Sequence, residues 1–238
     1  MKWVCLLVHF PSFFSYRIPD YSSQYALSVP LPSPSSIKLA VVATAIRTTG
    51  DVAEGKCVFY AVRDAEIRIV PPKQIAINSV FIKRLKKRGI KTKVDKEKYK
   101  QGLLPSFEST FCVREYVFFP EDVKLFISGG DIDSVVDYFN ALRYVGSGDS
   151  IVYVKRVEFV EEPPKNAIKA ITSEEFTKAI ASSDHFIVYP VKDLSKSAKF
   201  EQINPYSGKS GKNVFERKYY LLKAKAKKGK NWKILEIQ

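Results

Sequence analysis

The sequence has few cysteines and no long hydrophobic run. Cys5, Cys57 and Cys112 lie far apart in apolar surroundings without CxxC spacing, so neither a disulfide framework nor a zinc site is expected. We predict three buried, reduced thiols. No stretch approaches the ~18 uninterrupted apolar residues of a membrane span. The first residues (MKWVCLLVHFPSFF) lack the cleavage pattern of a secretory signal, and we expect a cytoplasmic protein without membrane association.

Recognisable catalytic and metal-binding motifs are also missing. The chain contains no HExxH, GxSxG or P-loop sequence and no acidic pair at metal-ligand spacing. Its two histidines, His9 and His185, do not belong to a recognisable catalytic motif, and we expect a structural role for both. We therefore expect no metal, no cofactor and no catalytic residue.

Positive charge is abundant and unevenly distributed. The formal net charge is +14 in 238 residues. Residues 83–100 hold ten Lys/Arg against two acidic residues, and residues 209–233 hold ten against Glu216 alone. The rest of the chain, with 19 basic and 22 acidic residues, is close to neutral. Charge focused in this way attracts polyanions, nucleic acid before anionic membrane, although a solvated lysine-rich surface has the same composition.

The first 160 residues alternate strand and helix patterns. Ser33 followed by Pro34 predicts the start of a helix that continues to about Arg47. Residues 10–32 contain four prolines and are expected to be extended or looping chain. The other predicted helices cover 52–62 and 131–143, and the predicted strands cover 1–9, 65–82 with a break at Pro71-Pro72, 109–119, 123–128 and 150–160.

This order predicts an α+β fold with two parts. Residues 1–160 fit a ferredoxin-like β-α-β-β-α-β domain, and residues 161–238 fit a smaller β-rich C-terminal lobe. The basic insertion 83–101 interrupts the first part. It has little apolar periodicity and contains Gly89, so we expect a long, partly mobile excursion between strands.

A glycine bend at residues 146–150 (GSGDS) is a candidate anion site. Glycine permits the positive φ angles that turn successive amides toward one anion, and Ser147 and Ser150 add hydroxyls. Arg143 and Tyr144 flank the bend and offer a charge and a ring to single-stranded RNA. A helix C-cap followed by a tight turn would use the same residues.

The helix start is a second candidate anion site. Free N–H groups and the helix dipole at Ser35 and Ser36 favour a phosphate, and Lys38 adds charge. An ordinary capped helix has the same sequence signature.

Three other segments are candidates for RNA contact. The run 83–100 has Tyr99 as its single aromatic residue, so it fits the neutralisation of phosphates better than the stacking of bases. A solvated loop without RNA contact is the alternative. Arg114 and Tyr116 share one face of a predicted strand and can line a groove, unless Tyr116 is core and Arg114 is paired. Tyr16 and Arg17 of the proline-rich loop can join the same site.

Four stretches, in this order, resemble one family. SVPLPSPSSIKLAVV looks like its Leu-Pro-Pro-Pro-Thr-Thr turn and helix, and TFCVREYVFF resembles its Thr-Phe-x-x-Arg-Glu-Tyr strand. A helix, glycine loop and strand follow at 131–160, and ERKYYLL resembles a late Arg-x-Tyr element. The family is the RAMP-type subunit of type I CRISPR surveillance complexes that holds the 5′ handle of the guide RNA. The archaeal type I-A branch is most similar, and the type I-D counterpart is second.

The resemblance implies a non-catalytic RNA-binding subunit of the complex, with no cofactor. Its partners would be the CRISPR RNA (crRNA) with its 5′ handle, the backbone subunit whose filament it caps and the large subunit, with a small subunit as a further candidate. The insertion 83–101 resembles a thumb that touches the guide RNA and the adjoining backbone subunit. The candidate RNA-binding residues are Tyr16, Arg17, Ser35, Ser36, Lys38, Lys83, Arg84, Lys86, Lys87, Arg88, Lys91, Lys93, Arg114, Tyr116, Arg143, Tyr144, Gly146, Ser147, Gly148 and Ser150.

Two other functions remain open on sequence. Relatives in the type I-C branch cleave the CRISPR transcript with Tyr, Lys and His side chains, and a metal-independent endoribonuclease would depend on His9 or His185. The other is a generic basic RNA-binding protein without any CRISPR association.

Overall fold

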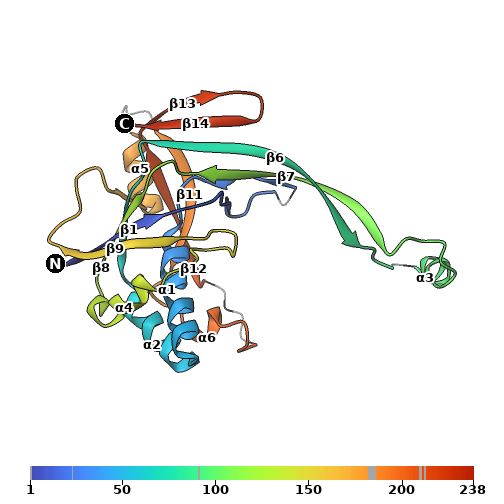
Figure 1. Ribbon diagram of the computed structural model, residues 1–238, viewed down its shortest axis with the longest axis horizontal. Helices are drawn as coiled ribbons and strands as arrows, with labels where there is room; N and C mark the ends of the chain where they lie inside the picture. The colour runs from blue at the N-terminus through green and yellow to red at the C-terminus, as the bar shows by residue number, and fades with distance from the viewer. Residues whose placement is uncertain (1, 23, 91, 182–185, 209–210, 212) are drawn as a thin grey trace.

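A long two-stranded arm projects from a body of sheets and helices in the computed structural model (Figure 1). The structure describes residues 2–22, 24–90, 92–181, 186–208, 211 and 213–238. The arm consists of β6 (Gln74–Lys87) and β7 (Phe107–Phe118), with α3 (Lys93–Lys100) at its end. The predicted combination of helices and strands in one chain is confirmed.

The first sheet of the body has the strand order β10-β5-β8-β1-β9, with antiparallel neighbours throughout. Its strands are β1 (Trp3–His9), β5 (Glu66–Val70), β8 (Val123–Ser128), β9 (Tyr153–Val160) and β10 (Ile168–Lys169). Because side chains alternate along a strand, β1 sends Val4, Leu6 and Val8 into the main core and Trp3 and Cys5 into a smaller cluster. This confirms the predicted first strand, buried on both faces.

Helices α1 (Pro34–Thr49) and α2 (Val52–Arg63) connect β1 to β5 along the chain. Ser33 is the N-cap of α1, since its side chain accepts the N–H of Ser36, and Pro34 occupies the first helical position. Gly50 ends α1 in the left-handed conformation, with φ 73°. The predicted positions of both helices are confirmed.

The helix predicted over 131–143 is shorter than expected. A 3₁₀ turn, η1 (Ile132–Val135), precedes α4 (Val136–Asn140). Neither element has a side-chain hydrogen bond that caps its start. Because α4 ends at Asn140, the glycine bend 146–150 lies beyond it, and the helix C-cap in the alternative interpretation is wrong. The tight turn in that alternative is confirmed, since Tyr144 and Ile151 on either side of the bend form an antiparallel bridge.

The second sheet has the order β13-β14-β6-β7-β3 and includes the arm. Its remaining strands are β3 (Tyr25–Ala26), β13 (Ala224–Lys228) and β14 (Trp232–Ile237), and a separate pair joins β2 (Tyr16–Arg17) to β4 (Ser28–Val29). The predicted excursion at 83–101 is a projecting arm, but it begins within a strand rather than between strands. Residues 83–87 continue β6 and pair with 107–111 of β7. A capping box of Thr92 and Asp95 then starts α3.

The tail contributes strands to both sheets of the first 160 residues. Strand β10 pairs with β5, and β14 pairs with β6. The other tail elements are α5 (Ser173–Ile180), β11 (Ile187–Leu194), α6 (Phe200–Ile203) and β12 (Phe215–Leu222). Strands β11 and β12 form a hydrogen-bonded pair whose Tyr189 and Tyr220 belong to the main core. The division into domains at residue 160 stays a prediction.

The cysteines differ in burial. Cys5 is buried as predicted, but Cys112 is only half-buried and Cys57 is exposed on α2, so the predicted burial of Cys57 is wrong and that of Cys112 is only partly met. Among the described residues, no helix is long and apolar enough to cross a membrane.

Candidate nucleic-acid interface

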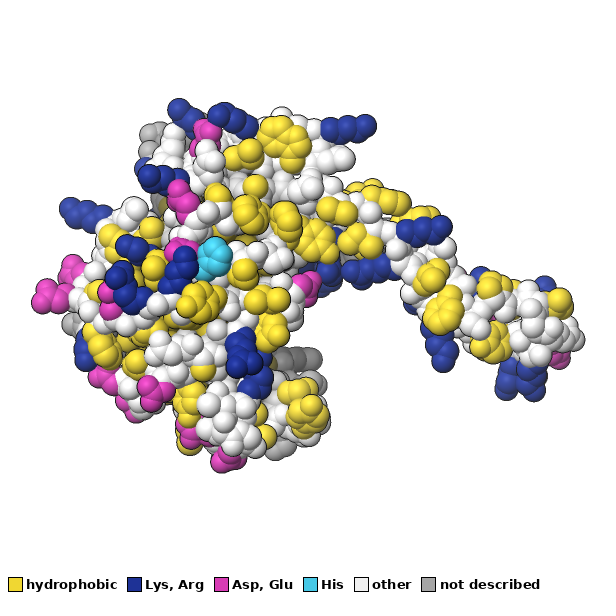
Figure 2. Space-filling view, viewed as in Figure 1, with side chains coloured by type: hydrophobic (Ala, Val, Ile, Leu, Met, Phe, Trp, Pro, Cys, Tyr) yellow, Lys and Arg dark blue, Asp and Glu magenta, His cyan; other side chains and the backbone are white. Residues whose placement is uncertain are grey.

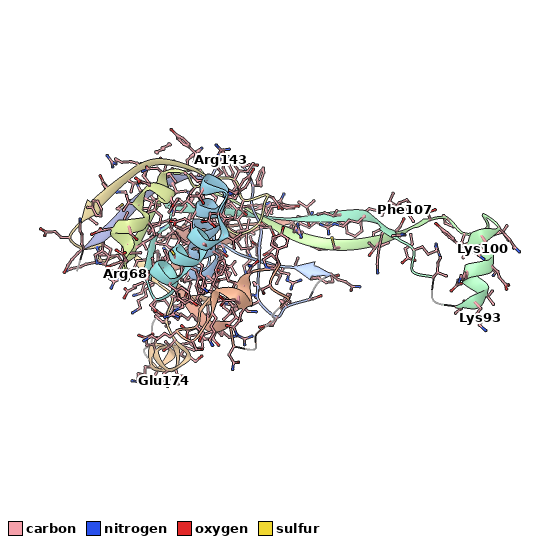
Figure 3. The ribbon with its side chains drawn as sticks, turned by 90° about the horizontal axis from the view of Figure 1, so that it is seen from below. Arg68, Lys93, Lys100, Phe107, Arg143 and Glu174 are labelled. Atoms are coloured by element: carbon pink, nitrogen blue, oxygen red, sulfur yellow. The ribbon has the colours of Figure 1, made fainter. Side chains whose placement is uncertain are left out.

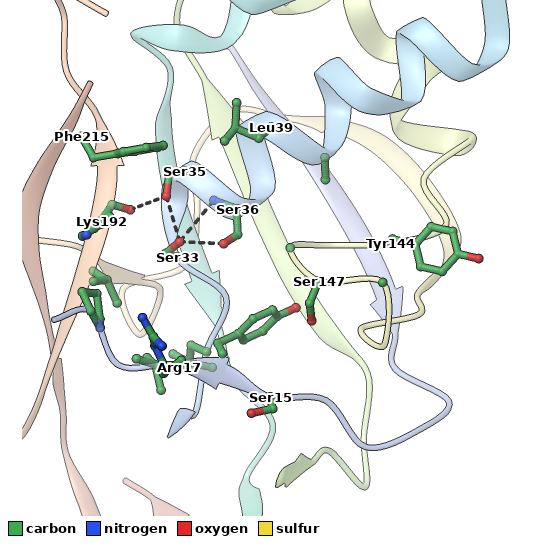
Figure 4. Close-up of a pocket in the computed structure, with 18 of the residues that line it drawn as sticks. Ser15, Arg17, Ser33, Ser35, Ser36, Leu39, Tyr144, Ser147, Lys192 and Phe215 are labelled. Carbon is green, nitrogen blue, oxygen red and sulfur yellow. Dashed lines mark hydrogen bonds between the residues drawn. The ribbon is translucent and has the colours of Figure 1, made fainter. Parts of the chain in front are cut away.

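A groove of about 970 Å³ opens on the body where segments distant in sequence converge (Figure 4). Residues of the proline-rich loop, of α1, of the glycine bend and of β7, β11 and β12 line it. It contains nine predicted RNA-binding residues, namely Tyr16, Arg17, Ser35, Ser36, Arg114, Tyr144, Gly146, Ser147 and Gly148. It also contains Ser15, Pro19, Asp20, Val29, Leu31, Ser33, Leu39, Ala40, Ala43, Arg47, Val191, Lys192 and Phe215.

One face of α1 forms a wall of the groove. Ser36, Ala40, Ala43 and Arg47 follow one another at intervals of three or four residues, which places them on the same side of a helix. At the start of the helix, the Ser33 hydroxyl contacts the Ser36 hydroxyl at 2.8 Å and accepts the Ser36 N–H at 3.2 Å. The capped-helix alternative is therefore correct, and the same serines also present polar atoms to the groove.

The glycine bend forms the facing wall. Its two ends are joined by backbone bonds from Val145 N–H to the Ser150 carbonyl (3.1 Å) and from Ser150 N–H to the Ser147 carbonyl (3.0 Å). Gly146 has φ +84°, and a Cβ there would lie 2.7 Å from Tyr16 Cε1 and 3.5 Å from Ser36 Oγ. A side chain at 146 would thus clash with a buried ring, whereas Gly148 has no atom within 4 Å of an added Cβ. Glycine is required at the first position only.

Tyr16 packs against the glycine bend. Its ring is buried and its hydroxyl donates a 2.6 Å hydrogen bond to the Val145 carbonyl. Burial raises the pKa of the Tyr16 phenol far above its usual range. The side chain is therefore a neutral support of the groove floor rather than a ring free for stacking. Arg17, the next residue, is exposed and lines the groove.

Positive charge dominates the groove. Arg17, Arg47, Arg114 and Lys192 line it, and Asp20 is the one acidic residue among its described lining residues. Asp20 accepts from Arg217 at 2.7 Å and Lys192 at 3.5 Å, and the hydrogen bond from Arg217 holds the pKa of this carboxyl below its usual range. The arrangement suits a polyanion that runs along α1 and past the bend.

Besides Lys192, which contacts Asp20, two more of these cations have partners in the walls. Arg114 lies 3.7 Å from Asp149, and this pair ties the bend to β7. The Arg47 guanidinium lies over the Tyr144 ring at 5.3 Å. A phosphate that enters the groove would therefore compete with Asp149 for Arg114.

The prediction that Lys38 presents its charge at the helix start is wrong. Its side chain is 2% exposed, and its ammonium donates to Asp193 Oδ1 (2.8 Å) and to the Arg63 carbonyl (2.9 Å). Burial lowers the pKa of Lys38 against the opposing effect of Asp193. The residue is one turn along α1 from the cap, on the side that packs against β11.

Three further predicted residues do not line the groove. Ser150 is fully buried and its hydroxyl contacts that of Ser147 at 3.0 Å, so the prediction that it contacts RNA is wrong. Arg143 is exposed outside the groove, and Tyr116 is half-buried on β7 opposite Asn78. Their RNA-binding roles stay predictions.

The basic insertion lies on the arm and not in the groove. Lys83, Arg84, Lys86, Lys87 and Lys93 are exposed there and Arg88 is half-buried, whereas Lys91 lies outside the described residues. Figure 3 shows Lys93, Lys100 and Phe107 far along the arm, away from Arg143 on the body. The arm nevertheless begins at the groove, because Arg114 in the groove wall is the strand partner of Val80.

Sequence reasoning missed several groove residues. Arg47 could have been found, since it continues the helix face that starts at Ser36. Lys192 of β11 and Phe215 of β12 carry no local signal, because only tertiary packing brings these strands to α1. The Ser35 hydroxyl donates to the Lys192 carbonyl at 2.9 Å and fixes this approach.

The described lining residues of the groove include no histidine. No group of three or more possible metal-ligating side chains occurs in the described ranges. His9 lies outside the groove and its Nδ1 contacts Asp122 Oδ1 at 2.8 Å. The structural role of His9 stays a prediction. His185 lies outside the described residues.

Comparisons with known proteins point to one family. No family model matches the chain. The chain is 69% identical to "CRISPR-associated protein Cas5" of Archaeoglobus fulgidus (strain ATCC 49558) over 238 residues, the full length of both. Among solved structures, it matches a CRISPR protein from Archaeoglobus fulgidus with a TM-score of 0.47 and 14% identity, covering 100% of this chain and 92% of that one. It also matches a chain of a CRISPR RNA-guided surveillance complex with a TM-score of 0.39 and 12% identity, covering 92% of this chain and 89% of that one.

Proposed function

Because the chain belongs to the CRISPR-associated Cas5 family, we propose that it is a non-catalytic, RNA-binding subunit of a CRISPR surveillance complex. In this proposal the complex is of a type I-A-like kind, the subunit holds the 5′ handle of the guide RNA, and it caps the filament of backbone subunits. The first sheet, in which β9-β1-β8-β5 alternate with helices along the chain, would be the ferredoxin-like unit.

One observation carries the proposal. The groove brings the helix start at Ser33–Ser36 and the bend at Gly146–Gly148 together, and it adds the cations Arg17, Arg47, Arg114 and Lys192. Hydroxyls, an open glycine loop and cations in one groove are what the backbone of a single strand needs. The basic arm, which starts at the same groove, would extend the contact.

The absence of catalysis is part of the proposal. None of the described groove residues is a histidine, the Tyr16 hydroxyl is buried and hydrogen-bonded, and His9 is paired with Asp122 outside the groove. A side chain that activates a 2′-hydroxyl must reach it by a hydrogen bond. The purified chain should leave repeat RNA intact in EDTA, and cleavage that His9→Ala abolishes would favour the endoribonuclease instead.

Binding is tested with the full chain and a labelled single-stranded RNA of the host's repeat handle. Arg17→Ala and Arg47→Ala should each weaken binding and reduce the slope of log affinity against log salt by about 0.7, because each removes a phosphate contact. Arg156→Ala is the matched control, since Arg156 is exposed on β9, away from the groove. Equal affinity and slope in all three variants and the parent would refute the proposed groove.

A further inference from the structure

The two faces of the arm differ in chemistry. Residues directly opposite each other on antiparallel strands have their side chains on the same face. The pairing of β6 with β7 is regular from residue 76 to residue 87, so it assigns each side chain to a face. The aromatic face, as we define it, consists of Phe81, Lys83, Leu85 and Lys87 of β6 with Phe107, Ser109, Phe111 and Val113 of β7. The opposite face has Ile82, Arg84 and Lys86 with Glu108, Thr110 and Cys112.

The rings of the aromatic face are uncovered. Phe81 is 66% exposed, Phe107 56% and Phe111 53%. Phe81 and Phe111 stack on each other, with centroids 5.4 Å apart and an angle of 23° between their planes. Figure 2 shows hydrophobic side chains along the arm, with Lys and Arg side chains beside them. The arm thus displays three rings that are each more than half exposed.

Lysines alternate with these rings. Lys83 is the strand partner of Phe111, and Lys87 is the strand partner of Phe107. The aromatic face carries no acidic residue over 81–87 and 107–113, all of which the structure describes. Protein-binding surfaces are depleted in lysine, whereas surfaces for single-stranded nucleic acid combine exposed rings with cations. The chemistry of this face therefore favours a nucleic acid over a protein.

We propose that the aromatic face binds unpaired bases of a single-stranded RNA. Bases would stack on Phe107 and on the Phe81–Phe111 pair, while Lys83 and Lys87 neutralise the phosphates between them. Phe107 and Phe111 are about 13 Å apart along the strand, so each takes a different base. This inference rests on the proposed function and deepens it, since the basic segment alone lacks the aromatics for stacking and β7 supplies them.

The test uses the full chain and a single-stranded handle RNA that carries the fluorescent base 2-aminopurine. Phe107→Ala and Phe111→Ala should each lower the affinity by about fivefold or more, since a stacked base contributes at least 1 kcal/mol. They should leave the salt slope unchanged and reduce the quenching of 2-aminopurine. Phe111→Trp should restore affinity and quenching, and Phe111→Leu should not. Thermal unfolding verifies the fold, which these exposed positions should not disturb.

Two controls separate stacking from charge and from the groove. Lys83→Ala and Lys87→Ala should each reduce the salt slope by about 0.7. An abasic RNA of equal length should bind the parent and Phe111→Ala equally. Unchanged affinity and quenching in both Ala variants would overturn the proposal and favour a protein as the partner of this face. The proposal would also fail if the Phe→Ala variants lost as much affinity for the abasic RNA as for the handle RNA. If the Phe variants weaken binding while Arg17→Ala does not, the stacking face stands and the proposed groove fails.

Discussion

Replacing Gly146 by alanine should loosen the bend against α1 and weaken RNA binding. The left-handed φ of +84° at this position is open to glycine but strained for alanine. The new Cβ would also lie 2.7 Å from Tyr16 Cε1. Tyr16 cannot easily give way, because it is buried and its hydroxyl is bonded to the Val145 carbonyl at 2.6 Å.

The size of the effect follows from these two contacts. A left-handed alanine costs roughly 1–2 kcal/mol, and forcing a methyl group into a packed site costs about 1–3 kcal/mol. We expect Gly146→Ala to lower the free energy of unfolding by about 3 kcal/mol. For a chain of this size, that corresponds to a fall in the melting temperature of about 6–12 °C.

Gly148→Ala is a matched control in the same bend. Gly148 has no atom within 4 Å of an added Cβ and no left-handed φ, so alanine should be neutral or slightly stabilising. Calorimetry gives the melting temperatures, and fluorescence anisotropy with handle RNA gives the affinities. Equal melting temperatures and affinities for the two variants would refute the role of Gly146 as the packed hinge of the bend.

Two further predictions concern the support of the groove. Asp193 accepts from Lys38, from Lys218 and from the Leu194 N–H, each at 2.8 Å. Asp193→Ala leaves the Lys38 charge buried without its carboxylate and should cost about 3–5 kcal/mol in urea unfolding, whereas a loss under about 1 kcal/mol would contradict this account. Ser33→Ala removes the N-cap of α1 and should cost about 1 kcal/mol, while Ser33→Asp should keep most of the stability; equal losses in both would exclude a capping role.

Local signals predicted most elements of the fold. Ser33 and Pro34 mark the start of α1, and the apolar run of β1 predicts a strand buried on both faces. The nature of the arm could not be predicted, because residues 83–87 have no apolar pattern of their own. They form a strand since β7, twenty residues further on, provides their hydrogen-bond partners.

The same division between local and tertiary information holds for the groove. The glycine bend and the serines of the helix start have a local chemical signature, so the sequence alone predicted them as candidate anion sites. Lys38 has the sequence signature of a phosphate-binding lysine, yet Asp193, distant in sequence, holds it in the interior. Lys192 and Phe215 reach the groove through the packing of β11 and β12, which no pattern near either residue indicates.

Strand β14 pairs with β6 at the base of the arm. Strand β14 pairs with residues 74–78, immediately before β6 leaves the body, and β3 pairs with β7 on the other side. A two-stranded ribbon alone is marginally stable in water, so these flanking strands set the direction in which it projects. Truncation before Trp232 should therefore change the direction in which the arm projects, although the arm lies about 150 residues earlier in the sequence.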